Sequence, residues 1–545
     1  MQTLASSIQS FREIQRERCL YVDKTEYLHR LLLDGRAFCL YRPKGFGKSL
    51  LISTIKELFS GDKELFEKLY IHKAGWEFTR NPVISLPLSA FSSDSPQTLS
   101  EELAWELKKI ADREEVLVRG VRPATLLSYL IQALDIKYRK KVVVLIDDSD
   151  EPVTRNIQDP ELAFQNSLVL ENFFKSLIIS RDRIRFAFVT GGYRLKSLNV
   201  GDGFFKDISL SPRYAGILGI SVSELYNYFK EPLSEILPLI KAESEDFPLD
   251  LEALYSELVR WYGGYSWDGE QKLIDPSSLI SLLENASFGD YWSWHSFNPA
   301  LAKILAKDPL ILNPDATLSY DRGELEKVIF SPSVPLMYQA GVLSIVKSQT
   351  LGGKEFILDY PNLVVERGTV TAALQELTLI ESAKLRRYGR EFRQKAIEEG
   401  PLSLAKILED FLQELSLASL PGGNKKKLKE VKLAIFSLLF RLAGFKVKCL
   451  PNGNLEGQMS VNDKLRLVIS LRSIGASSKA PLGMRKRLLS EALNEALNLQ
   501  AATPIDPGEH LKEFILIVCG KNVLGGTSNR QGSLYFRPLK KAPGE

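Results

Sequence analysis

Residues 37–59 read AFCLYRPKGFGKSLLISTIKELF and indicate the fold of the N-terminal part. Ala37–Tyr41 is a short apolar run, as expected of a buried strand. Apolar residues recur at helical spacing from Leu50 to Phe59, which predicts a helix. The segment between them, RPKGFGKS, is short and contains two glycines. The order is therefore strand, tight loop, helix.

A loop in this context can hold phosphate, because its backbone N–H groups form a concave anion site at a helix N-terminus. The usual pattern is G-x-x-x-x-G-K-[ST], and here the first position is Arg42. We expect Lys48 to reach the β- and γ-phosphates of ATP and Ser49 to ligate Mg²⁺. An ordinary turn with an exposed lysine is the alternative, since G-K-S is a short pattern. The predicted nucleotide-binding residues are Arg42, Gly45, Phe46, Gly47, Lys48, Ser49 and Leu50.

A second strand is predicted at Lys141–Asp148, which reads KVVVLIDD. A β-branched run that ends in acid delivers a carboxylate to the carboxyl edge of a parallel sheet. We expect Asp147 to hold Mg²⁺ and Asp148 to orient the attacking water, where most P-loop ATPases have Glu. Asp148 is one methylene shorter than Glu, which predicts poor positioning of that water. The alternative is a pair of aspartates that caps the next helix.

A third strand, Arg185–Gly192, ends near Thr190, which is predicted to sense the γ-phosphate or the attacking water. A strand-end threonine without such a role is the alternative. Arg194, Lys196 and Arg213 follow, and each is a candidate for a charge-stabilising group of the arginine-finger type. The sequence does not choose among these three.

Composition is that of a globular protein, with 44% hydrophobic and 25% charged residues in 545. A chain of this length corresponds to roughly three to four domains. It contains no run of about 18 apolar residues, and its first residues lack the apolar core of a signal peptide. The four cysteines and four histidines are dispersed, so no zinc site is predicted. We expect a cytoplasmic protein with no membrane span.

Charge is uneven along the chain. Residues 421–545 carry 21 Lys and Arg against 9 Asp and Glu, whereas the whole chain has a net charge of +4. A basic C-terminal quarter on an acidic body indicates a polyanion partner such as nucleic acid. A solvated lysine-rich surface explains the same charges.

The chain resembles the bacterial predicted AAA-type ATPases fused to a PD-(D/E)XK nuclease-like domain. Segments that match this family's pattern occur in its order over roughly residues 10–370. They are YVDKTEYLHRLL (21–32), RPKGFGKSLLISTIKELFSG (42–61), VVVLIDDSDEP (142–152), DISLSPRYAGILGISVSEL (207–225), WYGGYSW (261–267), LIDPSSLISLL (273–283), DYW (290–292), LMYQAGVLSI (336–345) and YPNLVVER (360–367). The family's phosphate loop typically begins with Arg-Pro, so Arg42 agrees with the resemblance.

Two departures from the family qualify what the resemblance implies. The family's acidic motif reads like LIDEYDKP, whereas this chain has LIDDSDEP at 145–152. Nucleotide binding should survive this change, but fast hydrolysis should not. In the nuclease-like domain, the positions expected to hold the metal-binding Asp, the Glu and the Lys align with Ser460, Ser470 and Arg472.

Two hydroxyls cannot replace two carboxylates around Mg²⁺, which prefers charged oxygen ligands. Arg472 would attract phosphate rather than metal. Glu456 and Asp463 are the acids nearby. The resemblance therefore implies a nuclease fold without nuclease chemistry.

The sequence thus predicts an α/β protein in three parts. A P-loop NTPase domain with an AAA/ASCE-like parallel sheet (1–222) is followed by a helical lid or connector (223–400) and a small restriction-endonuclease-like α/β domain (405–545). The predicted function is a slow ATPase or nucleotide-dependent switch that uses ATP, ADP and Mg²⁺, with nucleic acid as a candidate partner of the basic C-terminal domain. The alternatives are an active ATP-dependent nuclease in defence against foreign DNA and an interaction protein with a structural nucleotide. An oligomer is compatible with the sequence.

Overall fold

The computed structural model describes residues 10–195, 203–243, 250–295, 299–313, 319–325, 333–350, 354–415, 425–449, 455–462, 465–474, 510–519 and 522–527. The chain packs into two compact units. Unit 1 contains residues 1–300 and 316–365, and unit 2 contains residues 301–315 and 366–545. Residues 223–400, predicted as a region of their own, are therefore shared between the two units.

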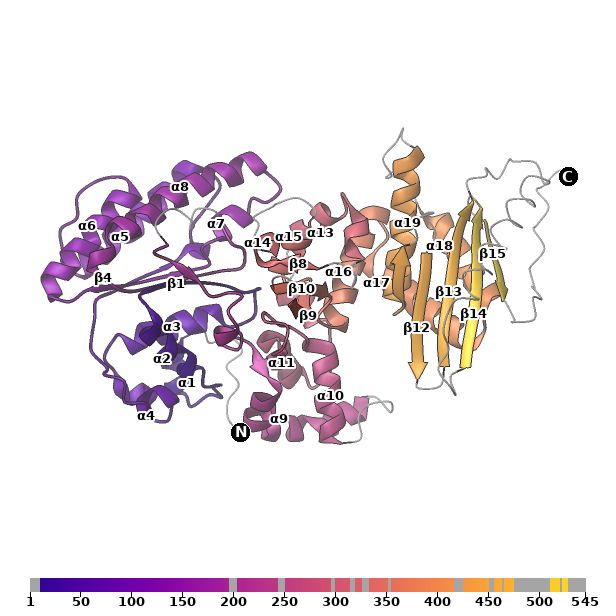
Figure 1. The fold of residues 1–545 in the computed structure, drawn as a ribbon, viewed down its shortest axis with the longest axis horizontal. Helices are drawn as coiled ribbons and strands as arrows, with labels where there is room; N and C mark the ends of the chain where they lie inside the picture. The colour runs from indigo at the N-terminus through magenta and orange to yellow at the C-terminus, as the bar shows by residue number, and fades with distance from the viewer. Residues whose placement is uncertain are drawn as a thin grey trace. The chain divides into compact units, whose positions relative to one another are not determined.

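Unit 1 is built on a five-stranded parallel sheet in the order β2-β3-β4-β1-β5 (Figure 1). The strands are β1 (Ala37–Tyr41), β2 (Val83–Pro87), β3 (Val142–Asp147), β4 (Ile184–Gly191) and β5 (Lys206–Asp207). Because β4 lies between β1 and β3, it pairs with both the phosphate-loop strand and the acidic strand. The predicted α/β fold with a parallel sheet is confirmed.

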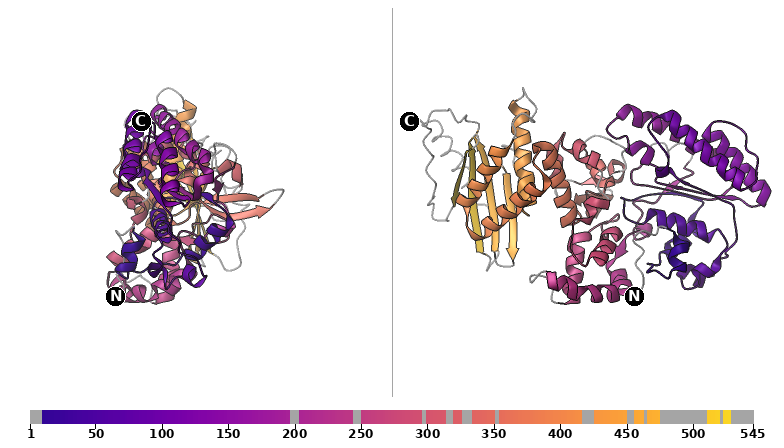
Figure 2. Two further views of the ribbon diagram at one scale, coloured as in Figure 1. Left: turned by 90° about the vertical axis from the view of Figure 1, so that its left-hand side faces the viewer. Right: turned by 180° about the vertical axis from the view of Figure 1, so that it is seen from behind.

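Helices cover both faces of this sheet (Figures 1 and 2). One layer is α5 (Pro96–Arg113), α6 (Pro123–Tyr138) and α8 (Pro160–Ile179). The other contains α1 (Phe11–Arg16), α2 (Thr25–Asp34), α3 (Lys48–Leu58) and α4 (Tyr70–Lys73). Strand side chains point alternately to the two faces. Cys39, Val144 and Ala187 accordingly join the core under the first layer, while Phe38 and Phe186 point to the second. All of β1 and β3 is buried, as a parallel sheet requires.

The rest of unit 1 is mainly helical. The first long helix of this part, α9 (Val222–Glu243), begins at a capping box. In this box the amide of Glu224 donates to Ser221 Oγ (3.2 Å), and the amide of Ser221 donates to Glu224 Oε2 (2.8 Å). The elements are α7 (Glu151–Thr154), β6 (Ile220–Ser221), α9 (Val222–Glu243), α10 (Leu251–Tyr262), β7 (Leu273–Ile274), α11 (Pro276–Asn285), α12 (Tyr291–His295), β8 (Tyr320–Asp321), α14 (Arg322–Leu325), α15 (Val334–Gln339), β9 (Ser344–Thr350) and β10 (Lys354–Asp359).

Unit 2 combines helices with a five-stranded sheet in the order β11-β12-β13-β14-β15. Strands β11, β12 and β13 are antiparallel neighbours, β14 runs parallel to β13, and β15 is antiparallel to β14. The strands are β11 (Lys446–Cys449), β12 (Leu455–Asn462), β13 (Leu465–Ile474), β14 (His510–Cys519) and β15 (Asn522–Thr527). The helices are α13 (Pro299–Leu305), α16 (Leu363–Thr378), α17 (Ser382–Glu398), α18 (Pro401–Glu414) and α19 (Lys425–Leu442), the first two beginning in unit 1.

The register of this sheet corrects one detail of the sequence analysis. Ser460, aligned with the metal-binding Asp, lies within β12 and pairs with Arg466. The residue paired with Ser470 is Glu456. Glu456 rather than Ser460 therefore stands opposite the expected Glu position, and Asp463 lies outside the described residues.

Within the described part of the chain, no helix combines the length and the apolarity that crossing a membrane requires.

Candidate functional site

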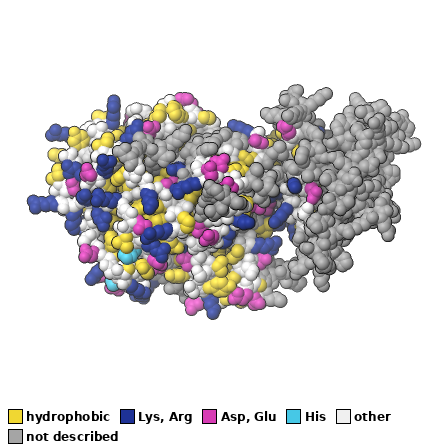
Figure 3. Space-filling view, in the orientation of Figure 1, with side chains coloured by type: hydrophobic (Ala, Val, Ile, Leu, Met, Phe, Trp, Pro, Cys, Tyr) yellow, Lys and Arg dark blue, Asp and Glu magenta, His cyan; other side chains and the backbone are white. Residues whose placement is uncertain are grey.

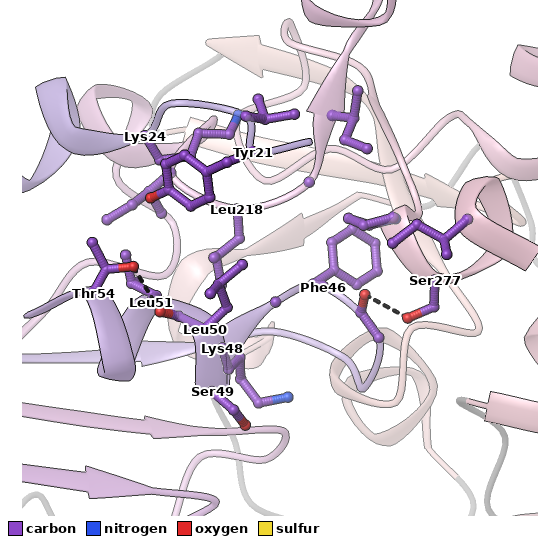
Figure 4. A pocket seen from close by; sticks show the side chains of 18 of the residues that line it. Tyr21, Lys24, Phe46, Lys48, Ser49, Leu50, Leu51, Thr54, Leu218 and Ser277 are labelled. Atoms are coloured by element: carbon purple, nitrogen blue, oxygen red, sulfur yellow. Dashed lines mark hydrogen bonds between the residues drawn. The ribbon is translucent and has the colours of Figure 1, made fainter. Parts of the chain in front are cut away.

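A cavity of about 470 Å³ lies beside the phosphate loop in unit 1 (Figure 4). Its volume is in the range of small-molecule sites. One end is lined by residues 44–51 and by Asp148. The other end is largely apolar and is lined by Ile14, Leu20, Tyr21, Val22, Ile217, Leu218, Ile220, Phe229 and Ile280. The cavity thus joins a polar, cationic end to an apolar one.

The loop has the backbone that an anion site requires. Gly45 and Gly47 adopt φ of 87° and 92°, the left-handed region that favours glycine. Gly47 is the N-cap of α3, so the first amides of that helix face the loop. The Nζ of Lys48 donates to the carbonyl oxygens of Arg42 (3.0 Å) and Pro43 (3.1 Å). The ammonium group of Lys48 is therefore held against the backbone of its own loop.

Arg42, predicted to bind nucleotide, does not line the cavity. Its side chain is 1% exposed and its Nη1 donates to the carbonyl oxygens of Tyr41 (2.9 Å) and Ser209 (2.8 Å). The guanidinium lies 4.0 Å from the ring centroid of Trp267, a cation–π geometry. Burial lowers the pKa of Arg42 to about 10, so the group stays protonated at neutral pH. Arg42 therefore stabilises the loop through contacts outside the cavity.

Aromatic residues of the WYGGYSW segment support the loop as well. The ring of Phe46 meets the rings of Tyr265 and Trp267 edge to face, at centroid distances of 4.8 and 5.2 Å. Tyr265 and Trp267 are buried and do not line the cavity. These two residues of the segment therefore fill a core rather than line the cavity.

Helix α11 contacts the loop through one hydroxyl. Ser277 Oγ donates to the carbonyl oxygen of Gly45 at 2.9 Å (Figure 4). Asp275, the N-cap of α11, accepts from the amide of Ser277 (3.1 Å) and from Ser278 Oγ (2.6 Å). The cap therefore fixes the position of the hydroxyl that holds the loop.

The two predicted Mg²⁺ ligands lie together. Burial raises the pKa of Asp147, as does the charge of Asp148, while hydrogen bonds from Ser49 and Thr190 and the charge of Lys48 oppose the rise. A serine hydroxyl and a carboxylate are oxygen donors that suit Mg²⁺, which usually completes its shell with substrate phosphates and water. Among the described residues, no three His, Cys, Asp or Glu side chains gather as a metal site. This donor set therefore fits Mg²⁺ held jointly with a nucleotide.

The two predicted catalytic residues occupy different places. Asp148 lines the cavity and has φ of 49°, a conformation that Asp tolerates better than most residues. Thr190 is fully buried, does not line the cavity, and donates from Oγ1 to Asp147 Oδ1 at 2.5 Å. Asp148 thus faces the cavity directly, whereas Thr190 acts on Asp147.

Asp150 is a site residue that the sequence analysis missed. Its carboxylate is 4% exposed and accepts from the amides of Gly192 (2.7 Å) and Tyr193 (3.0 Å). Burial raises the pKa of Asp150 to about 6, and the nearby charge of Lys48 opposes the rise. The available signal was the third acid in LIDDSDEP, which the family motif LIDEYDKP also contains.

The predicted charge-stabilising groups are held away from the cavity. Arg194 Nε lies 3.2 Å from Asp207 Oδ2, and Arg213 Nη2 lies 3.1 Å from Asp34 Oδ1. Lys196 lies outside the described residues. Of the residues that the structure describes, the cations that line the cavity are Lys24, Lys44 and Lys48.

Lys24 belongs to the apolar end of the cavity. Its Nζ donates to Glu224 Oε1 (2.7 Å) and to the carbonyl oxygen of Gly216 (2.9 Å). Burial lowers the pKa of Lys24, and the charge of Glu224 opposes the fall. This pair joins the start of α2 to the first turn of α9.

Two comparisons with known proteins bear on this geometry. Residues 5–200 match the family model described as Predicted AAA-ATPase. The matched segment contains the phosphate loop, the acidic strand β3 and Thr190, and the match supports an ATP-binding role. An uncharacterized protein in the vnfD 5' region of Azotobacter chroococcum mcd 1 is 28% identical over 397 residues, which cover 69% of this chain and 70% of that protein.

Proposed function

We propose that unit 1 binds ATP together with Mg²⁺ and acts as a slow ATPase or nucleotide-dependent switch. The observation that carries this proposal is the single cavity that joins the phosphate loop and Asp148 to an apolar end. Phosphates would take the loop amides and Lys48, and the nucleoside would take the apolar end. The family match over residues 5–200 supports the same ligand class.

Each site residue has a definite task in this proposal. Ser49 and Asp147 would hold Mg²⁺, which supplies charge stabilisation for the phosphates. Thr190 keeps the Asp147 carboxylate oriented through its 2.5 Å hydrogen bond. Asp148 is the carboxylate that lines the cavity and can orient water. Because its side chain is shorter than that of Glu, we propose that hydrolysis is slow and that the bound triphosphate persists.

Phosphate release from Mg²⁺-ATP tests the catalytic part of the proposal. We expect slow turnover by the wild type and none by Lys48→Ala. Brisk turnover would show that Asp148 suffices as the water-orienting acid and would contradict the switch. Tight binding with no turnover at all, and no response of any partner to the nucleotide, would favour an interaction protein with a structural nucleotide.

We further propose that the C-terminal part of unit 2, from about residue 405, is a nuclease-like domain without nuclease chemistry. The topology supports this, since a helix, three antiparallel strands and a further parallel strand follow one another. The register places one acid, Glu456, opposite Ser470, where a magnesium nuclease requires two carboxylates. Cleavage of DNA with Mg²⁺ or Mn²⁺, lost in Glu456→Ala, would instead support the active ATP-dependent nuclease.

Nucleic acid is the proposed partner of the basic C-terminal part. On the face of unit 1 in Figure 3, basic side chains lie interspersed with acidic and apolar ones. Basic residues of this part include Lys425–Lys427 and Arg485–Arg487, whose side chains lie outside the described ones. Salt-dependent binding of the full chain to duplex DNA and RNA tests this partner, because each phosphate contact steepens the dependence on salt.

A further inference from the structure

Hydrolysis or sensing of ATP requires positive charge near the terminal phosphate, which P-loop proteins often supply with a second cation besides the loop lysine. The expected arginines are poorly placed for this. Arg194 and Asp207 have side chains only 17% and 9% exposed, so separating them would leave a charge buried without its partner. Arg213 does not line the cavity, and its Nη2 pairs with Asp34.

Lys44 is differently placed. It is the third residue of the phosphate loop and lines the same cavity as Lys48 and Asp148. Its side chain is 54% exposed, and its Nζ lies 3.4 Å from Glu151 Oε1. Glu151 is the first residue of α7, and the turn 148–150 separates it from the end of β3. The Lys44–Glu151 contact therefore joins the phosphate loop to the acidic turn beside the cavity.

This contact is easy to exchange. Ion pairs with an exposed partner contribute little, and a separation of 3.4 Å is long for a charge-assisted hydrogen bond. Glu151 would keep a second cation, since Arg155 Nη2 lies 3.8 Å from the same oxygen. A triphosphate offers Lys44 several negative charges and stronger acceptors than one carboxylate. The Lys44 ammonium therefore binds phosphate in preference to Glu151 when both are present.

We propose that Lys44 is a second phosphate-contacting cation supplied by the loop itself, held by Glu151 until the terminal phosphate of ATP arrives. Lys44 then distinguishes ATP from ADP, because ADP lacks the phosphate that draws it away from Glu151. The exchange also breaks the Lys44–Glu151 contact between the loop and α7. The acidic turn therefore differs between the ATP-bound and the ADP-bound protein. This inference rests on the proposed nucleotide-binding function.

The test compares affinities for ADP and for a non-hydrolysable ATP analogue, each with Mg²⁺, in the full chain. Lys44→Met should weaken the ATP analogue about ten- to hundredfold and ADP by less than about threefold. Glu151→Gln removes the carboxylate that pairs with Lys44 and should tighten the analogue up to about fivefold with ADP unchanged. Lys109→Met is the matched control, because Lys109 is 57% exposed and pairs with Glu106 at 3.2 Å far from the cavity.

The inference is supported if Lys44→Met weakens binding of the ATP analogue, Glu151→Gln tightens it, and neither variant changes the affinity for ADP comparably. Equal weakening of both nucleotides by Lys44→Met, or no change, overturns it while leaving nucleotide binding intact. If the folded wild type binds neither nucleotide, the proposed function and this inference both fail. Thermal melting of each variant shows whether a loss of binding reflects a loss of fold.

Discussion

The carboxylate of Asp150 accepts a hydrogen bond of 2.7 Å from the backbone amide of Gly192. This contact joins the acidic turn after β3 to the end of β4. The phosphate loop joins the same structure, because the amide of Arg42 donates to the carbonyl oxygen of Gly191 at 3.0 Å. The loop, the acidic turn and the end of β4 thus form one hydrogen-bonded group. Asp147 at the end of β3 and Thr190 in β4 belong to this group.

Gly191→Ala should destabilise the protein through this group. A Cβ at residue 191 would lie 2.5 Å from Asp150 Oδ1 and 2.9 Å from Ser149 Oγ, closer than atoms can approach. We expect a loss of about 1–3 kcal/mol in the free energy of unfolding, measured by denaturant titration. In an Asp150→Ala background the same substitution should cost less. An equal cost in both backgrounds would show that contact with Asp150 is not the cause.

Arg42→Gly should harm the protein although it restores the usual first glycine of a phosphate loop. The substitution removes a buried side chain, two hydrogen bonds and the stacking on Trp267. Two guanidinium nitrogens, Nε and Nη2, have no hydrogen-bond partner in the described structure, which reduces the loss. We expect about 2 kcal/mol lower stability and weaker ATP binding, measured by unfolding and calorimetry. Unchanged stability with tighter binding would refute the supporting role.

Asp148→Glu should speed hydrolysis and lower stability together. The longer carboxylate reaches further into the cavity and can orient water better, so turnover should rise about tenfold or more. Glu tolerates the left-handed backbone of residue 148 less well than Asp, at a cost of about 1 kcal/mol. Phosphate release and thermal melting measure the two effects. Asp148→Asn is the control that should lose turnover, and no gain for Glu would mean that another group orients the water.

The buried cap Asp275 predicts a pH dependence of stability. Burial raises its pKa to about 6 from the ordinary 3.8, so the folded state holds the proton more tightly than the unfolded state. Its contribution to stability is complete below the unfolded pKa and is lost as pH rises through about 6.

Asp275→Asn keeps a capping group without the charge. From about pH 5 to about pH 8 the wild type should therefore lose about 1 kcal/mol more stability than this variant. Denaturant unfolding at both pH values measures the difference. Parallel pH profiles for the two proteins would contradict the raised pKa.

Much of the sheet and of the loop could be predicted from sequence because their signals are local. β1, β3 and β4 are short apolar runs, and the loop residues 45–49 are read from a contiguous motif. The roles of Arg42 and Asp150 could not be predicted, because each depends on partners far along the chain, Ser209 and Trp267 for one and Gly192 for the other. The partners of Arg194 and Arg213 are equally non-local.

The misplacement of Ser460 has a related cause. The alignment of Ser460 with the metal-binding Asp rests on the family resemblance, whereas the register of β12 depends on its pairing with β13. A shift of four residues along one strand moves Glu456 into the position opposite Ser470. Pairing between strands is set by the sheet and leaves little trace in either strand alone.

Calorimetric titration of the full chain with Mg²⁺-ATP shows whether unit 1 binds this nucleotide. We expect saturable binding at one site per chain by the wild type, and its loss in Lys48→Ala and Lys48→Met variants that still melt cooperatively. Two substitutions are used because Lys48 is buried and either one alone could perturb the loop. A folded wild type that takes up no nucleotide, or variants that bind as well as the wild type, would contradict the account.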